Sequence, residues 1–225
     1  MSLRRLAPLA LAAASLVGAS ALAAVPVLQQ PAQEAAQARG GIHTITKDAP
    51  RIEALLKESG WVSPHIKGKP LYMLSFRSCP DCIRFETEQF PDLHKAKIDT
   101  RVIVVARRAK STEPERTGVG EVWATRNWKT FEDWTTTPVD AWTGDGLKSG
   151  DTDPQRAALV EKGRVLVDQL TPLLAENNIE LRYPTFVWHD AHGQLRACAC
   201  EDRSEYKYIR SELGLPQEPV TVASN

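Results

Sequence analysis

Residues 71–82 read Leu71-Tyr72-Met73-Leu74-Ser75-Phe76-Arg77-Ser78-Cys79-Pro80-Asp81-Cys82, an apolar run that leads into two closely spaced cysteines. The apolar run is typical of a buried strand, and the residues from Pro80 to about 96 have the pattern of a helix. Two thiols spaced in this way at the start of a helix can close a small disulfide. The first thiol ionises easily there, because the N–H groups and the dipole at a helix N-terminus favour a thiolate. The segment therefore predicts a redox site.

The composition is that of an ordinary globular protein without a dominant charge. The chain has 225 residues, of which 42% are hydrophobic, and its formal net charge is zero. A core can therefore form, and no global electric field favours binding to nucleic acid or to an anionic membrane.

Residues 1–24 have the organisation of a cleavable secretory signal peptide. A basic start precedes an apolar stretch over 6–17, and small residues follow up to Ala24. We expect cleavage near Ala23 or Ala24 and a periplasmic or otherwise secreted protein; an uncleaved segment would anchor the protein in a membrane. All four cysteines would then lie outside the cytoplasm, where disulfides can form.

The rest of the chain divides into a linker, one folded domain and a tail. Residues 25–47 are rich in Ala, Gln and Pro and are expected to form a disordered linker. The folded domain is expected over 48–216, with a helical insert at about 121–179, and a flexible tail is expected over 217–225. Early in the domain we expect a helix that is capped by Asp48 and runs to about Ser59. A β-branched strand over 102–106 is expected in the centre of a parallel sheet, followed by a solvated basic loop over 107–110. Further along, we expect a strand at 184–188, its hairpin partner at 194–198 and a last helix over 203–213.

Two expectations concern side chains within the helices. Pro91 is expected to kink or split the helix that follows Cys79. The aromatic residues of the insert recur at near-helical spacing and are interpreted as core packing rather than as a ligand surface; they are Trp123, Trp128, Phe131 and Trp134.

The order of these elements resembles the thioredoxin fold, and it is most similar to the periplasmic DsbC and DsbG group. The residues that carry the resemblance are the strand and Cys-x-x-Cys helix over 71–90, the insert helices over 121–134 and the proline-led strand over 183–187. The resemblance covers roughly residues 70–215. It implies an α/β, thioredoxin-like fold with a helical insertion between the second and third core strands, after the active site.

The resemblance also implies roles for the residues at the matching positions. Cys79 would be the more exposed, attacking thiol, and Cys82 the resolving thiol that releases a mixed disulfide. Pro184 would be a cis-proline that lies against this pair, with Tyr183 beside it in the substrate groove; the alternative is an ordinary trans proline at a strand start. Met73 stands where thioredoxins have a buried acid, so no buried carboxylate relay is expected.

The two residues between the cysteines are expected to tune the site. Pro80 fixes its φ angle and lacks an N–H group. The carboxylate of Asp81 should raise the pKa of the Cys79 thiol, and the nearby Arg77 and Arg84 could offset this effect. We therefore expect a site that is less oxidising than one with a basic residue at the position of Asp81.

A second cysteine pair, Cys198 and Cys200, ends the expected hairpin. If the strand that begins at Pro184 runs away from Cys79, its partner must run back, which brings the second pair to the active-site edge at a distance on the order of 10 Å. Three interpretations stay open. The pair could relay electrons with the first pair, it could bind copper or zinc as soft ligands, or it could consist of bystander thiols or a local structural bridge.

Together these patterns favour an exported thiol–disulfide oxidoreductase, reductase- or isomerase-like, that acts on protein substrates. Its redox-active disulfide needs no further cofactor, and we expect no metal site. A recycling partner, which could lie in the membrane, is also expected. Only residues 25–69 separate the signal from the part of the chain that carries the resemblance, so a dimerisation domain like that of DsbC-like proteins is not expected and a monomer is. The alternatives are a copper- or zinc-binding, metallochaperone-like module and a thioredoxin-fold binding protein with weak catalysis.

Overall fold

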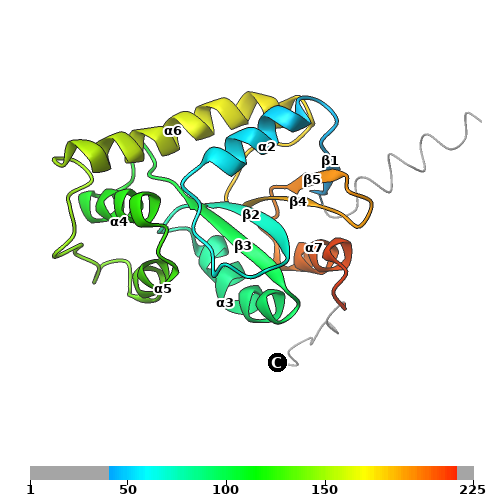
Figure 1. The fold of residues 1–225 in the computed structure, drawn as a ribbon, viewed down its shortest axis with the longest axis horizontal. Helices are drawn as coiled ribbons and strands as arrows, with labels where there is room; N and C mark the ends of the chain where they lie inside the picture. The colour runs from blue at the N-terminus through cyan, green and yellow to red at the C-terminus, as the bar shows by residue number, and fades with distance from the viewer. Residues whose placement is uncertain (1–40, 217–225) are drawn as a thin grey trace, which may run out of the picture.

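The computed structural model describes residues 41–216, in which helices cover both faces of a mixed sheet (Figure 1). Within these residues the sheet has five strands in the order β1-β5-β4-β2-β3. The strands are β1 (His43–Thr44), β2 (Lys69–Ser75), β3 (Ile98–Val104), β4 (Thr185–His189) and β5 (Leu195–Cys198). The expected signal peptide, most of the expected linker and the expected tail over 217–225 lie outside the described residues.

The strand pairing defines the fold class. β2 pairs in parallel with β3 on one side and antiparallel with β4 on the other, and β4 pairs antiparallel with β5. One helix connects β2 to β3, a group of helices connects β3 to β4, and a last helix follows β5. This is the thioredoxin fold with a helical insertion between the second and third core strands. The fold class expected from the sequence is therefore confirmed.

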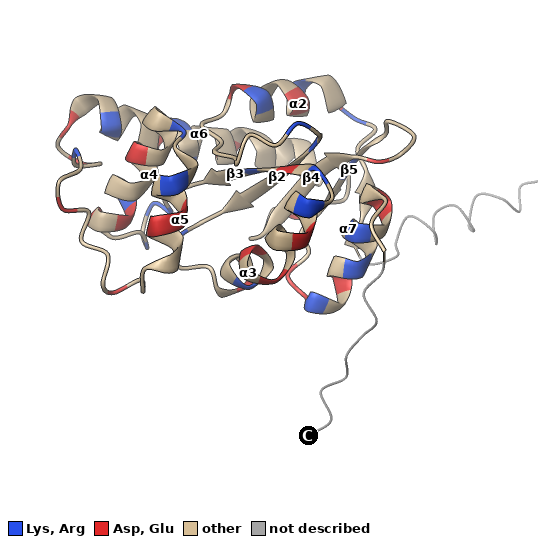
Figure 2. Cartoon of the chain, turned by 60° about the horizontal axis from the view of Figure 1, so that its bottom comes forward, with Lys and Arg blue, Asp and Glu red and all other residues tan. Residues whose placement is uncertain are grey.

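The helices lie in two layers around the sheet (Figure 1). α2 (Ala49–Glu58) and α6 (Pro154–Ala175) lie on one face, and α3 (Pro80–Lys95) and α7 (Tyr206–Leu213) lie on the other. A short 3-10 turn, η3 (Arg203–Glu205), leads into α7. Among residues 41–216, no helix combines the length and the apolar character that crossing a bilayer requires. Basic and acidic residues are interspersed along the helices (Figure 2), in agreement with the absence of a formal net charge.

The insertion consists of α4 (Glu113–Thr125), α5 (Trp128–Thr136) and α6. It begins earlier than expected because Thr112 and Glu115 form a capping box, in which each side chain accepts a hydrogen bond from the backbone N–H of the other residue, at 3.4 and 3.1 Å. The aromatic side chains of the insertion point inward: Trp123, Phe131 and Trp134 are buried, and Trp128 is half-buried. Their interpretation as core packing is confirmed.

The expectation of a central position for the strand around 102–106 is wrong. β3 lies at an edge of the sheet. Its outer side is covered by an antiparallel bridge in which Val62 and Val102 exchange two backbone hydrogen bonds, of 2.8 and 2.9 Å. Because this segment shields the edge, β3 can carry the apolar, β-branched pattern that is typical of a central strand.

Residues 41–47 do not belong to a linker, contrary to the sequence-based expectation. Ile42 and Ile45 are buried, and β1 pairs antiparallel with β5. The side-chain oxygen of Asn177 accepts hydrogen bonds from the backbone N–H groups of Thr46 and Lys47, both at 2.9 Å. The chain is therefore held against the domain before α2 begins.

Two helix details also differ from the expectations. α3 continues through Pro91 to its last residue and is not split. Asp48 precedes α2 in the left-handed conformation, with φ of 53°, and its side chain makes no capping hydrogen bond.

Candidate active site

The first cysteine pair lies where β2 ends and α3 begins. Cys79 is the N-cap residue of α3, and a disulfide joins it to Cys82 with a Cα–Cα distance of 5.2 Å. The backbone N–H of Cys82 donates a hydrogen bond to the Sγ atom of Cys79 at 3.1 Å. Once the disulfide is reduced, this N–H group and the helix dipole are placed to stabilise a thiolate on Cys79.

Tyr183 and Pro184 lie beside this pair. The ladder between β2 and β4 places Leu74 opposite Thr185, so the residues just before β4 meet the loop that follows β2. The Tyr183–Pro184 peptide bond is cis, and Pro184 is buried. The carbonyl oxygen of Tyr183 lies 3.6 Å from the Sγ atom of Cys79. The sheet thus brings together the two cysteines and the tyrosine–proline step, which are far apart in the sequence.

Both cysteine side chains are buried in the disulfide state. Cys79 is 2% exposed and Cys82 is 0% exposed, so Cys79 is the more accessible of the two by only a small margin. Phe76 and Tyr183, whose carbonyl oxygens contact Cys79, have half-buried rings that meet edge to face, with 5.1 Å between their centres.

The two residues between the cysteines are more accessible. Pro80 is exposed and Asp81 is half-buried. Asp81 forms an ion pair with Arg84, one turn further along α3. Arg84 also donates a hydrogen bond to the carbonyl oxygen of Glu201 at 3.0 Å. Arg84 therefore offsets the charge of Asp81, as expected.

A desolvated carboxyl group lies near the resolving cysteine, which the sequence interpretation missed. Glu86 follows Cys82 by one turn of α3, and desolvation raises its pKa to about 8, although the positive charge of Arg77 acts in the opposite direction. Arg77 is buried, and its guanidinium donates to the carbonyl oxygen of Thr137 rather than to Asp81. The sequence-based expectation that no buried carboxylate relay is present concerned the position of Met73, which is buried on β2, whereas Glu86 lies on α3. The sequence feature that could have revealed Glu86 is its spacing from Cys82, since residues four apart share one face of a helix.

Arg107, which follows β3, is also part of the site. Its guanidinium carbon lies 3.7 Å from the centre of the Phe76 ring, and its Nη2 atom donates to the hydroxyl of Ser78 at 3.1 Å. Burial raises the pKa of Tyr183 to about 12, against the opposing effect of the Arg107 charge. The interpretation of 107–110 as a solvated loop is wrong for Arg107. β2 and β3 are parallel neighbours, so the loops that follow them meet at one edge of the sheet.

The second cysteine pair also forms a disulfide. Cys198 and Cys200 have a Cα–Cα distance of 5.3 Å, and both are 0% exposed. Cys198 lies opposite Phe186 near the start of β4, which places the pair toward the same sheet edge as Cys79. The disulfide rules out the interpretation of the pair as two separate bystander thiols in this state. A second redox pair and a local structural bridge both agree with it. Within residues 41–216, no group of three or more His, Cys, Asp or Glu side chains is arranged to hold a metal ion.

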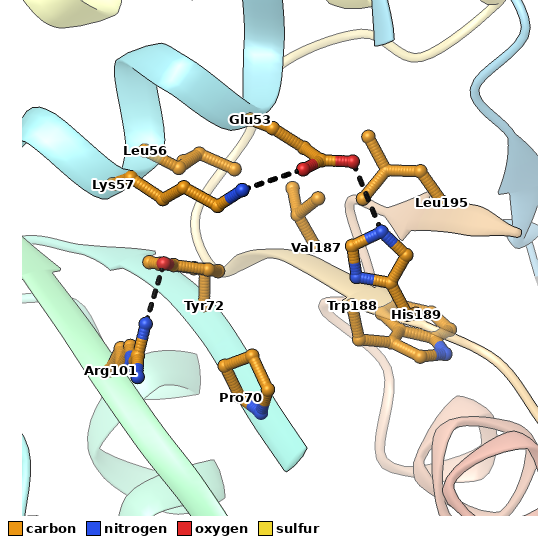
Figure 3. Close-up of a pocket in the computed structure, with 10 residues that line it drawn as sticks. All are labelled: Glu53, Leu56, Lys57, Pro70, Tyr72, Arg101, Val187, Trp188, His189 and Leu195. Carbon is orange, nitrogen blue, oxygen red and sulfur yellow. Dashed lines mark hydrogen bonds and ion pairs between the residues drawn. The ribbon is translucent and has the colours of Figure 1, made fainter. Parts of the chain in front are cut away.

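A separate pocket lies toward the opposite end of the sheet (Figure 3). Glu53 on α2 contacts Lys57 at 2.9 Å and His189 at 3.1 Å, and Arg101 donates to the hydroxyl of Tyr72 at 2.8 Å. His189 is thus held against α2. None of the residues that line this pocket is a cysteine.

No protein-family model and no curated protein matches the chain. Among solved structures, the chain is similar to BcfH from Salmonella enterica Typhimurium, with 16% sequence identity, coverage of 83% of this chain and 84% of that one, and a TM-score of 0.47. It is also similar to DsbA from Chlamydia trachomatis, with 12% identity, coverage of 59% and 82%, and a TM-score of 0.32. The assignment of the thioredoxin fold rests on the strand order and connections of this chain itself.

Proposed function

We propose that this chain is an exported thiol–disulfide oxidoreductase that exchanges disulfides with protein substrates through Cys79 and Cys82. One observation carries the proposal: the cysteine pair closes a disulfide at the N-terminus of α3, with the carbonyl oxygen of Tyr183 3.6 Å from the Sγ atom of Cys79. The sulfur atoms supply the chemistry, and the proposal includes no cofactor.

In the proposed reduction, the thiolate of Cys79 attacks one sulfur of a substrate disulfide, and the other substrate sulfur leaves and takes up a proton. Cys82 then loses its proton and attacks the Sγ atom of Cys79. The Cys79–Cys82 disulfide forms, and the second substrate sulfur leaves as a thiol. The substrate gains two electrons and two protons, and the protein is left oxidised. The same steps in reverse oxidise a substrate.

Access to Cys79 requires local movement in the disulfide state, because its side chain is only 2% exposed. Phe76 and Tyr183 are half-buried neighbours whose rings can shift. An extended substrate segment would then lie along the backbone at 182–183, where the Tyr183 carbonyl already faces Cys79.

The proposal includes a reductase- or isomerase-like character, as in the DsbC and DsbG group. It is supported by Asp81, since a carboxylate next to a thiolate disfavours the reduced form and makes the couple less oxidising. It also includes a monomer in the periplasm or another secreted compartment, and a recycling partner, which we place in the membrane.

A trapping experiment tests this function. The Cys82→Ser variant keeps the attacking thiol and loses the resolving thiol, so it should accumulate mixed disulfides with substrate proteins when it is exported in cells. Mass spectrometry of these adducts identifies the substrates. The matched Cys79→Ser variant should form none, and equal trapping by both variants would contradict the roles proposed for the two cysteines.

The reaction type is tested with purified protein. We expect the wild-type protein to accelerate insulin reduction and the reactivation of scrambled ribonuclease, and the Cys79→Ser variant to lose at least about 100-fold in rate, as is usual when a nucleophile is removed. A wild-type protein that accelerates neither reaction would refute the proposed function.

A further inference from the structure

We propose that Cys198 and Cys200 form a second redox-active disulfide, which exchanges electrons with Cys79–Cys82 inside the protein. This inference rests on the proposed function, because the first pair is the entry point for the electrons. It concerns a separate site with its own sulfur atoms. That site and Cys82 both face the layer between the sheet and α3.

The argument begins with the direction in which the side chains point. The ring of Phe186 on β4 packs against Phe85 on α3, with 4.3 Å between their centres. Cys198 is the register partner of Phe186, and directly opposite residues of an antiparallel pair point to the same face of the sheet. Cys198 therefore faces the layer between the sheet and α3. Cys82 on α3 is buried and lies in that layer.

The second step concerns position along the strands. The pair of Phe186 and Cys198 ends the ladder between β4 and β5, and Cys200 follows β5 at the same end of the ladder at which Pro184 precedes β4. Pro184 directly follows Tyr183, whose carbonyl oxygen lies 3.6 Å from the Sγ atom of Cys79. The second pair therefore lies at the same end of the strands as the first pair.

A side chain from α3 spans the two segments. Arg84 forms an ion pair with Asp81, which precedes Cys82, and donates to the carbonyl oxygen of Glu201, which follows Cys200, at 3.0 Å. The start of α3 and the end of β5 are thus packed against each other through one guanidinium group.

A purely structural role explains the second disulfide poorly. Its cysteines are only two positions apart, and a loop that short removes little entropy from the unfolded chain. The segment is already held by the ladder between β4 and β5. Both cysteines are 0% exposed, and the first pair, at 2% and 0%, is buried almost as deeply. The chain's remaining cysteines are Cys79 and Cys82, at the same end of the sheet, and we infer that electrons reach the second pair from them.

The exchange is written in two steps. With the first pair reduced, the Cys82 thiol loses its proton and its sulfur attacks the Sγ atom of Cys200; the Cys198–Cys200 bond breaks, the Cys82–Cys200 bond forms, and Cys198 leaves and is protonated. The thiolate of Cys79 then attacks the Sγ atom of Cys82, which restores the Cys79–Cys82 bond and releases Cys200 as a thiol. Two electrons and two protons move from the first pair to the second.

The intermediate can be captured in a variant that carries both Cys79→Ser and Cys198→Ser, in which Cys82 and Cys200 are the only thiols left. In a glutathione buffer, the folded variant should form the Cys82–Cys200 disulfide at least about tenfold more readily than the same chain in denaturant, where the two thiols meet only by random loop closure. Peptide mapping by mass spectrometry detects the bond. A folded variant, verified by circular dichroism, whose two thiols form no common disulfide would overturn the inference.

A kinetic measurement covers the case in which that variant does not fold. In the wild-type protein, reduction of Cys198–Cys200 by a small dithiol should follow reduction of the first pair. In a variant with Cys79→Ser and Cys82→Ser, it should slow by at least about tenfold, because the buried disulfide loses its internal donor. Equal rates would overturn the inference. Neither readout uses a protein substrate, so a failure of the proposed function, seen as no insulin reduction, is distinguishable from a failure of the second pair.

Discussion

The guanidinium of Arg107 stacks on the ring of Phe76, with 3.7 Å between its central carbon and the ring centre, although the two residues follow different strands. The parallel pairing of β2 and β3 brings these strand ends together. The contact fixes a positive charge beside Ser78, the residue that precedes Cys79. A charge held at the neighbouring residue should influence the redox equilibrium of the site.

The first prediction follows from this charge. An Arg107→Gln variant should have a reduction potential lower by about 10–30 mV, because a positive charge favours the thiolate and therefore the reduced form. Equilibration with glutathione measures the potential. The matched control is Arg108→Gln, since Arg108 pairs with Glu161 and Asp168 on α6. An equal shift of the reduction potential in both variants would show that the loss of any nearby positive charge has this effect, and not the contact of Arg107 with the site.

Asp81 should act in the opposite direction. An Asp81→Asn variant should have a reduction potential higher by about 10–20 mV, because it removes a negative charge beside the Cys79 thiolate. The effect is modest because Asp81 is one-third exposed and paired with Arg84. The Arg84→Gln variant should shift the potential downward. A potential that stays the same or falls in Asp81→Asn argues against this role.

Glu86 should make stability depend on pH. Its pKa is raised from 4.5 to about 8 in the folded protein, so the folded state binds more protons than the unfolded state between these values. Stability should therefore fall as the pH rises from about 4.5 to about 8. A Glu86→Gln variant lacks this loss and should be more stable above pH 8 by on the order of 2 kcal/mol, a figure reduced for partial solvent access.

Denaturant unfolding of the wild-type protein and the Glu86→Gln variant from acid to alkaline pH measures this difference. The control is Glu88→Gln, since Glu88 lies on the same helix and pairs with Arg203 near the surface. The Glu88→Gln variant should show the wild-type fall in stability. A Glu86→Gln curve parallel to that of the wild type would mean that Glu86 ionises normally.

Gly60 should be intolerant of a side chain. A Cβ atom there would lie 2.2 Å from the Trp123 ring, and the Nε1 atom of Trp123 is held by a hydrogen bond to the carbonyl oxygen of Val104 at 2.8 Å. Gly60→Ala should therefore destabilise the protein by about 1–3 kcal/mol. The comparison is Gly163→Ala on α6, whose Cβ would approach the same ring only to 3.2 Å and which gains helix propensity. Thermal unfolding should show a clearly larger loss for Gly60→Ala.

The local elements of the site were readable from the sequence because their signals are short-range. The apolar run before Cys79, the proline after it and the apolar run around Phe186 each specify a strand or a helix start within a few residues. The order of these elements then limits the topologies to very few. Errors arose where a distant segment changed the environment. The bridge to Val62 allows β3 to lie at an edge, and β5 orders residues 41–47.

The chain alone thus established the thiol pair, the helix that begins at it and the proline-led strand, since these depend on neighbouring residues and on the periodicity of apolar side chains. The tertiary structure decided the burial of Cys79, the approach of Arg107 to the site, the desolvation of Glu86, and the common layer of the two disulfides. These properties depend on which faces of separate elements meet, and desolvation and charge proximity arise only when the sheet and helices pack together.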